Sequence, residues 1–418
     1  MGTKTKLILS AVLAAGLLLF SYWVTNLRYP ISGEKAVLYK FELIRNYFSP
    51  QEETMSDSVL MVNVSFDKQS VVATDEYGFP VGQTQITDRK KLLSLLQYLK
   101  ERGDYKYILM DVFFGENGAR TEVDSALFST ILSMPRIVIP RHSDERLVDE
   151  RLYEKAGLAD YVTTYKEGSF VKYPYLMDSV KSMPVRMYEE LTGKHIEQHG
   201  IFYTDGNKLA RSCIVLTFEL ICQGAYNDEG EKTWYNLGMD LLGDSIDEYA
   251  IGDSLLYIIP ELTRGKYIVI GAYQDEDIHG NYLRAQPGVC INFNAYLALQ
   301  HGHHCISMIL YLILFTAFFV LFYLMLSQQT LKDLILQSKT SSKAPVRWTR
   351  RGLLVLCSWI GFSLFLSILC IITYLWLGEA YDIFITATLL GLMNKVVQII
   401  IKQKDKLWAI KEKFSGWL

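Results

Sequence analysis

The chain has little cysteine and no familiar catalytic motif, and these absences exclude several classes of protein. Six cysteines among 418 residues are too few for a dense disulfide framework. Their spacings do not match those of a zinc site. The sequence also lacks a nucleophile elbow, a phosphate-binding glycine loop, an HExxH helix and a paired CxxC motif. We therefore expect a protein that is not an enzyme and that holds neither a cofactor nor a metal.

Long apolar segments, in contrast, are present. Residues 7–25 form a run free of charge, close to the roughly 20 residues that cross a bilayer. Three further apolar runs cover residues 306–326, 353–377 and 383–401. No small-residue cleavage site stands in the right place after the first run, which favours a retained anchor over a cleaved signal peptide. The sequence thus predicts four transmembrane helices.

The basic residues next to these segments predict their orientation. Two lysines lie in residues 1–6, six basic residues and one acid in the loop 327–352, and five lysines in the tail 402–418. Under the positive-inside rule these three parts are cytoplasmic. The large domain of residues 28–304 is then extracytoplasmic, with one span before it and three after it.

The part predicted outside has no excess of positive charge. It and the short linker between the last two spans keep 28 of the 42 basic residues and 42 of the 45 acidic ones, a balance of −14. Such a charge disfavours binding to a phosphate backbone or to anionic lipid. We expect no nucleic-acid partner.

Alternating strand and helix patterns indicate an α/β fold for this domain. Apolar, β-branched runs predict strands at 58–66, 107–114, 136–140 and 266–270. Between the first three, leucine spacing predicts a helix that is capped by Thr87, has Asp88 in its first turn and ends at Gly103, and a second helix that begins at Thr121. Two consecutive strand–helix–strand units predict right-handed crossovers between neighbouring parallel strands.

Two pairs of residues are the candidates for ligand binding. Asp67 follows the first predicted strand and Asp111 lies in the second, so both are expected where adjacent parallel strands end, the usual crevice of an α/β sheet. Such a pair can bind a cation or an amine, or act as acid and base. The alternative is that both carboxylates cap helices and order loops.

Asp277 and His279 belong to a second acidic cluster, together with Asp275 and Glu276. These side chains suit a hard metal ion, but the glycine spacing of a calcium loop is missing, which favours a solvated loop. Three histidines, His301, His303 and His304, precede the second predicted span and fit either a pH sensor or an interfacial polar collar. The four cysteines of the outer domain, Cys213, Cys222, Cys290 and Cys305, are interpreted as buried small apolar residues, with a bridge between the first two as an alternative.

The order of these pieces resembles the CHASE2 family of bacterial extracytoplasmic sensory domains. The resemblance covers residues 38–302 and rests on the strand before Asp67, the MDVFF strand, the next helix with Asp124, and the segment GKYIVIGAYQDEDIHG…QPGVCINFNAYLAL. Family members have a glycine, an aspartate, a Pro-Gly turn and an Ala-Asn-like pair in this order. The matching positions here are Gly271, Asp277, Pro287, Gly288, Asn294 and Ala295. One span before the domain and three after it also match the family.

The resemblance implies a sensor, and the chain departs from the family in its output. Family members commonly carry a kinase or nucleotide cyclase after the last span, whereas this sequence ends at Leu418 after a lysine-rich tail. We therefore expect an α/β extracytoplasmic sensor domain plus an α-helical transmembrane region, in the bacterial cytoplasmic membrane. Its expected partners are the lipid bilayer, an unidentified extracytoplasmic ligand and a separately encoded cytoplasmic effector.

Other interpretations stay open. The pairs Ala11 with Ala15 and Ala387 with Gly391 have the small-xxx-small spacing that packs membrane helices, so a homodimer is possible. The alternatives to a sensor are a structural or docking subunit of an envelope or transport complex, and an exported enzyme without a familiar motif.

Overall fold

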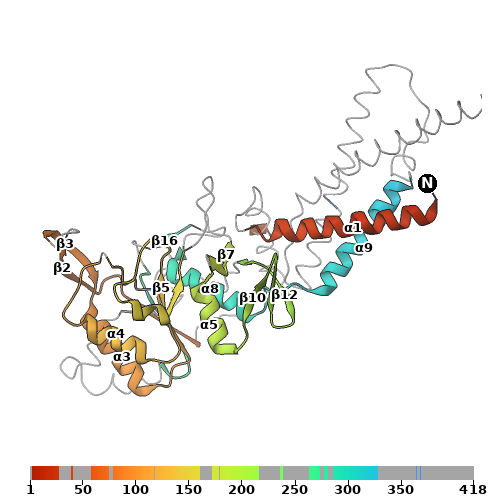
Figure 1. Cartoon of the computed structure of the whole chain (residues 1–418). Helices are drawn as coiled ribbons and strands as arrows, with labels where there is room; N and C mark the ends of the chain where they lie inside the picture. The colour runs from red at the N-terminus through yellow and green to blue at the C-terminus, as the bar shows by residue number, and fades with distance from the viewer. Residues whose placement is uncertain are drawn as a thin grey trace, which may run out of the picture. The chain divides into compact units, whose positions relative to one another are not determined.

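The chain forms two compact units, residues 1–27 with 306–418 and residues 28–305. A computed structural model, drawn in Figure 1, describes residues 2–27, 39–40, 58–74, 79–116, 118–160, 172–177, 179–215, 236–238, 263–273, 277–280, 286–327, 364 and 368. The second unit has nearly the bounds of the predicted outer domain.

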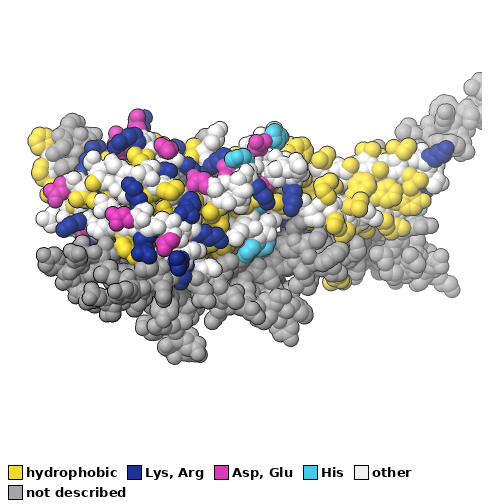
Figure 2. All heavy atoms as spheres, turned by 90° about the horizontal axis from the view of Figure 1, so that it is seen from below, with side chains coloured by type: hydrophobic (Ala, Val, Ile, Leu, Met, Phe, Trp, Pro, Cys, Tyr) yellow, Lys and Arg dark blue, Asp and Glu magenta, His cyan; other side chains and the backbone are white. Residues whose placement is uncertain are grey.

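The first unit contains two apolar helices, α1 (Thr3–Thr25) and α9 (Met308–Leu326). Both are long and apolar enough to cross a membrane. They lie side by side (Figure 1), with the rings of Tyr22 and Tyr311 edge to face at 6.5 Å. Figure 2 shows that their surface is mainly hydrophobic. The predicted spans 353–377 and 383–401 lie outside the described residues, apart from positions 364 and 368.

The second unit is built on a six-stranded parallel sheet in the order β14-β1-β15-β4-β5-β6. The strands are β14 (Asn236–Gly238), β1 (Val59–Asn63), β15 (Tyr267–Gly271), β4 (Tyr107–Met110), β5 (Ile137–Arg141) and β6 (Ala156–Leu158). Every residue of β1, β4 and β15 is buried, because helices cover both faces of the sheet. The α/β character predicted from the sequence is confirmed.

Helices form a layer on each face. On one face, α3 (Arg89–Arg102) and α4 (Asp124–Ser133) pack on alternate strand residues, such as Val62, Ile108 and Ile270, to form the main hydrophobic core. On the other face lie α5 (Met183–Thr192) and α8 (Gly288–Gln300), which pack against each other and against the sheet (Figure 1). The result is a three-layer α/β/α arrangement.

The predicted first helix is confirmed, but its N-cap is Asp88 and not Thr87. The Asp88 carboxylate accepts hydrogen bonds from the backbone N–H groups of Lys90 and Lys91, and Gly103 ends α3 with a left-handed φ of 63°. The predicted pairing of the first two strands is wrong, because β15 lies between β1 and β4. The second predicted pair is correct, since β4 and β5 are parallel neighbours.

Short antiparallel strands complete the unit. They are β2 (Lys68–Thr74) with β3 (Pro80–Thr87), β7 (Lys172–Pro174) with β13 (Cys213–Val215), β8 (Leu176–Met177) with β9 (Val180–Lys181), β16 (Ile278–His279) with β17 (Gln286–Pro287), and the sheet β10 (Ile196–His199), β11 (Phe202–Asp205), β12 (Lys208–Ala210). A 3-10 helix, η2 (Glu150–Glu154), precedes β6. The face of this unit in Figure 2 mixes basic and acidic side chains.

Cys213 is a buried thiol, as interpreted from the sequence, whereas Cys305 is a partly exposed thiol and Cys290 is not a thiol. Cys290 is disulfide-bonded, to a partner outside the described residues. Cys213 and Cys305 carry thiols, so a bridge from Cys213 to Cys222 is wrong. Spacing alone does not determine which cysteines meet, because pairing depends on segments that are distant in sequence.

Candidate functional site

The candidate site is a cavity of about 500 Å³ at the carboxyl ends of the parallel strands. The residue directly after each of five strands lines it: Val64 after β1, Ala272 after β15, Asp111 after β4, His142 after β5 and Ala159 after β6. Parallel strands all end at the same edge, so the groups that follow them converge there. The cavity is therefore a consequence of the sheet topology.

Asp111 is the most perturbed carboxylate of the cavity. Its backbone N–H donates to the carbonyl of Ile270 at 2.7 Å, which fixes the chain just past β4. Its Oδ2 accepts a hydrogen bond from Nδ2 of Asn292 at 3.0 Å. Asn292 is oriented in turn by Tyr173, whose hydroxyl donates to Asn292 Oδ1 at 2.6 Å. A buried chain of hydrogen bonds thus leads from Tyr173 to the carboxylate.

Burial and a second carboxylate raise the pKa of Asp111 to about 7. Loss of hydration on burial is the largest cause, and the negative charge of Asp277 adds to it. The hydrogen bond from Asn292 and the nearby His142 and His279 act in the opposite direction. Asp111 therefore exchanges its proton near neutral pH, and it does so beside a second acidic group.

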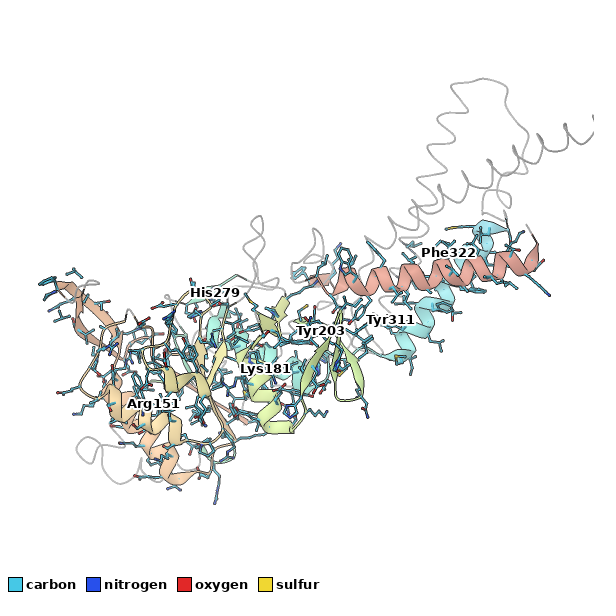
Figure 3. All side chains as sticks on the ribbon, in the orientation of Figure 1. Arg151, Lys181, Tyr203, His279, Tyr311 and Phe322 are labelled. Atoms are coloured by element: carbon cyan, nitrogen blue, oxygen red, sulfur yellow. The ribbon has the colours of Figure 1, made fainter. Side chains whose placement is uncertain are left out.

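Asp277 is held against the first turn of α8. Its carbonyl accepts from the backbone N–H of Gly288 at 2.8 Å, and its Oδ1 lies 2.6 Å from Nε2 of His279. A Cβ at position 288 would meet the Asp277 carboxylate, so a larger residue there would displace this side chain. His279, which Figure 3 labels, is the second residue of β16. Asp277 and His279 both line the cavity.

The structure brings together three of the four residues predicted from the sequence. Asp111, Asp277 and His279 share the cavity, although the sequence analysis placed them in separate clusters. Asp275 and Glu276, the other members of the second acidic cluster, lie outside the described residues. Asp277 is partly exposed, with 36% of its side chain accessible, and it lines the same cavity as Asp111.

Asp67 is the exception, and its predicted approach to Asp111 is wrong. Strand β15 separates β1 from β4, and Asp67 stands four residues past the end of β1. Its Oδ1 accepts from Nζ of Lys91 on α3 at 3.2 Å, and its carbonyl accepts from the N–H of Asp88 at 2.8 Å. Asp67 thus holds the N-terminal end of α3 in place. A structural role of this kind was the alternative interpretation for this residue.

Two residues of the site were missed from the sequence. Nδ1 of His142 lies 2.6 Å from Oδ1 of Asp160. The His142 ring packs edge to face on the ring of Phe113, with 4.6 Å between the centroids. It follows a predicted strand, so the rule that singled out Asp111 applies to it as well. Asn292 lies in a helix, and only the tertiary structure shows that its amide reaches Asp111.

Residues that carry the CHASE2 resemblance shape the packing behind the cavity. A Cβ at Gly271 would lie 2.7 Å from Cβ of Val289, so glycine lets β15 approach α8 closely. Asn294 is fully buried and donates from Nδ2 to the carbonyl of Cys290 at 2.8 Å. These residues position the first turn of α8, which carries Gly288 and Asn292.

Chemically, the cavity offers three carboxylates (Asp111, Glu145 and Asp277), two imidazoles (His142 and His279) and two cationic side chains (Lys68 and Arg89) beside the aromatic residues Phe113 and Tyr173. Its volume is that of a pocket for a small organic molecule. Comparison with models of known protein families, with curated proteins and with solved structures found no match for this chain.

Proposed function

We propose that this chain is a sensory protein of the bacterial cytoplasmic membrane whose α/β domain lies outside the cell membrane and binds a small molecule with a cationic amine. The observation that carries the proposal is the pair of carboxylates, Asp111 and Asp277, in one cavity, where the charge of one raises the pKa of the other. A positive group between them relieves this repulsion and favours the ionised form of Asp111. Glu145 adds a third carboxylate, so the acidic side chains of the lining outnumber its two cations, Lys68 and Arg89.

The hydrogen bonds of the cavity support an amine as the recognised group. Asn292 occupies Oδ2 of Asp111 and His279 occupies Oδ1 of Asp277. Within the described part of the chain, the second oxygen of each carboxylate has no side-chain hydrogen bond and can accept one from the N–H groups of a ligand. Phe113 and Tyr173 provide aromatic surface for the apolar part of the same molecule.

The sensory part of the proposal rests on the predicted membrane layout and on the CHASE2 resemblance. The domain of residues 28–304 follows α1 directly and leads into α9, which are two of the four proposed spans. A ligand that favours one conformation of the domain biases the positions of these helices. The loop 327–352 and the tail 402–418 pass this bias to a separately encoded effector, and the chain itself catalyses no reaction.

Thermal denaturation of the full-length protein in detergent tests the proposal. We expect an amine to raise the melting temperature, since a ligand at 100 times its Kd adds about 2.7 kcal/mol to the free energy of unfolding. Its N-acetylated form, which carries no positive charge, should give no shift. The shift should be lost in Asp111→Asn and Asp277→Asn and kept in the control Asp67→Asn, whose carboxylate lies outside the cavity.

The other outcomes separate the competing functions. If no compound stabilises the protein and affinity capture from membranes yields a stoichiometric protein complex, the chain is a docking subunit. If a compound is turned over and Asp111→Asn abolishes the turnover, the chain is an enzyme. Either result contradicts the proposal.

A further inference from the structure

A second cluster of polar side chains lies in the same unit, away from the cavity. Asp205 is the last residue of β11, a strand of the small antiparallel sheet that Tyr203 locates in Figure 3. His304 and Cys305 follow about a hundred residues later. They reach Asp205 because Cys305 forms an antiparallel bridge with Ala210 of β12 and the N–H of Arg211 donates to the carbonyl of His304 at 3.0 Å. The sheet edge thus holds this short segment in place.

The geometry points to a zinc site formed by Asp205, His304 and Cys305, and we propose that the chain binds one zinc ion there. Oδ2 of Asp205 and Nε2 of His304 are 3.1 Å apart, Nε2 and Sγ of Cys305 are 3.5 Å apart, and Sγ and Oδ2 are 3.9 Å apart. In a tetrahedral zinc site with bonds of about 2.0–2.3 Å, neighbouring ligand atoms are separated by about 3.4–3.6 Å. The three observed distances bracket this value.

A catalytic cysteine–histidine–aspartate triad does not fit the same atoms. In a triad the imidazole contacts the nucleophile through one nitrogen and the carboxylate through the other. Here Nε2 of His304 faces both Asp205 and Cys305, while its Nδ1 is buried without a hydrogen-bond partner among the described residues. When one imidazole nitrogen faces both the carboxylate and the thiol, the three ligand atoms converge on one point, as they do around a single metal ion.

Burial makes the cluster costly without a cation. The side chains of Asp205 and His304 are 2% and 0% exposed, and Oδ1 of Asp205 has no hydrogen-bond partner among the described residues. A zinc ion with one carboxylate, one thiolate and one neutral imidazole carries no net charge, which removes the cost of a buried charge.

Neighbouring residues hold the ligands in position. The hydroxyl of Tyr188 donates to Oδ2 of Asp205 at 2.8 Å. The rings of Tyr175 and Tyr188 pack edge to face on the imidazole of His304, at 6.3 and 5.5 Å between centroids. Second-shell contacts of this kind orient metal ligands. Cys305 is partly exposed, which gives an ion a route to the site and a place for a water as fourth ligand.

A bound ion would fasten β11 to the chain just before the second apolar helix. Cys305 stands three residues before Met308, where α9 begins. The site shares no residue with the cavity of Asp111 and Asp277, so the zinc proposal does not depend on the proposed amine recognition. Sequence spacing did not reveal it, because Asp205 and His304 are 99 residues apart.

Metal binding by the detergent-solubilised full-length protein tests the proposal. After removal of metal by a chelator, we expect zinc to bind at about one ion per chain. Cobalt in its place should give a thiolate-to-cobalt absorption band and the visible bands of a tetrahedral ion. Cys305→Ser should remove the thiolate band, and His304→Gln should lower the affinity at least about 10-fold.

Two matched variants serve as controls. Cys213→Ser removes a thiol of the same unit that is not in the cluster, and His303→Gln removes the neighbouring imidazole. Both should bind zinc as the wild type does. The cobalt spectrum of the wild type does not depend on whether any variant folds. A wild-type protein without a thiolate-to-cobalt band, or Cys305→Ser with unchanged zinc affinity, would overturn the proposal.

Discussion

The amide of Asn292 donates to the carboxylate of Asp111 across 3.0 Å and so joins the first turn of α8 to the end of β4. This contact places a helix from late in the chain over a strand from its first third, 181 residues earlier. It also fixes which oxygen of Asp111 faces the cavity. The properties of the site depend on this hydrogen bond, on the charge of Asp277 and on the close packing of α8.

Replacing Asn292 by alanine should raise the pKa of Asp111 further, because the hydrogen bond from Asn292 lowers it. The variant also removes the Oδ1 acceptor of the Tyr173 hydroxyl, which keeps the carbonyl of Leu158 at 3.2 Å, so the free energy of unfolding should fall by only about 0.5–1.5 kcal/mol. Titration of Asp111 by NMR, with selective labelling, and thermal denaturation measure the two effects. Tyr173→Phe keeps the bond to Asp111 and should change the pKa much less. An equal pKa change in both variants would argue against the assigned contact.

The stability of the domain should fall as the pH rises from about 4 to about 7. Over this range the unfolded chain loses the Asp111 proton at its usual pKa, whereas the folded protein keeps it until about pH 7. The folded state therefore binds more protons, and the free energy of unfolding decreases with pH. The shift corresponds to at most about 4 kcal/mol, and water in the cavity reduces it.

Asp111→Asn is the variant that isolates this effect. Asparagine has nearly the same shape and no charge, so the fall in stability attributed to Asp111 should disappear while contributions from other groups stay. Melting temperatures of both proteins between pH 4.5 and 8 provide the measurement. Parallel curves for the two proteins would show that Asp111 titrates normally.

Gly271→Ala should destabilise the domain, because the new Cβ would lie 2.7 Å from Cβ of Val289. Overpacking of this kind costs about 1–3 kcal/mol. Gly16→Ala in α1, where nothing lies within 4 Å, is the matched control and should not destabilise the protein. Chemical denaturation followed by circular dichroism compares the variants. If the Gly271 variant were as stable as the wild type, β15 and α8 would not pack as closely as described.

Asp67→Asn should lower stability without changing ligand recognition. The Asp67 side chain is 2% exposed and pairs with Lys91, so the loss of its charge should cost about 1–3 kcal/mol. The double variant with Lys91→Met should recover part of this loss, because it removes the ammonium group that has lost the charge of Asp67. A double-mutant cycle of melting temperatures gives the coupling. No coupling between the two positions would contradict the ion pair.

Local sequence patterns predicted the helices and strands well, but they predicted less well which strands are neighbours in the sheet. Leucine spacing with Asp88 and Gly103 was enough to predict α3, because capping and helical periodicity are local properties. The insertion of β15 between β1 and β4 was not predictable in this way, since β15 follows more than 150 residues after β4. For the same reason the sequence suggested Asp67, and not Asp277, as the partner of Asp111.

Proton release on ligand binding tests most directly whether the cavity at the carboxyl ends of the strands recognises a cationic amine. Calorimetric titrations at pH 7 in buffers of different ionisation enthalpy measure it. For the wild type, binding of an amine at pH 7 should release up to about half a proton, because a positive ligand ionises an Asp111 whose pKa is about 7 and which is therefore about half protonated. Asp111→Asn should bind weakly and lack this contribution. Tight binding with no proton release, and with the same affinity in Asp111→Asn, would contradict the account.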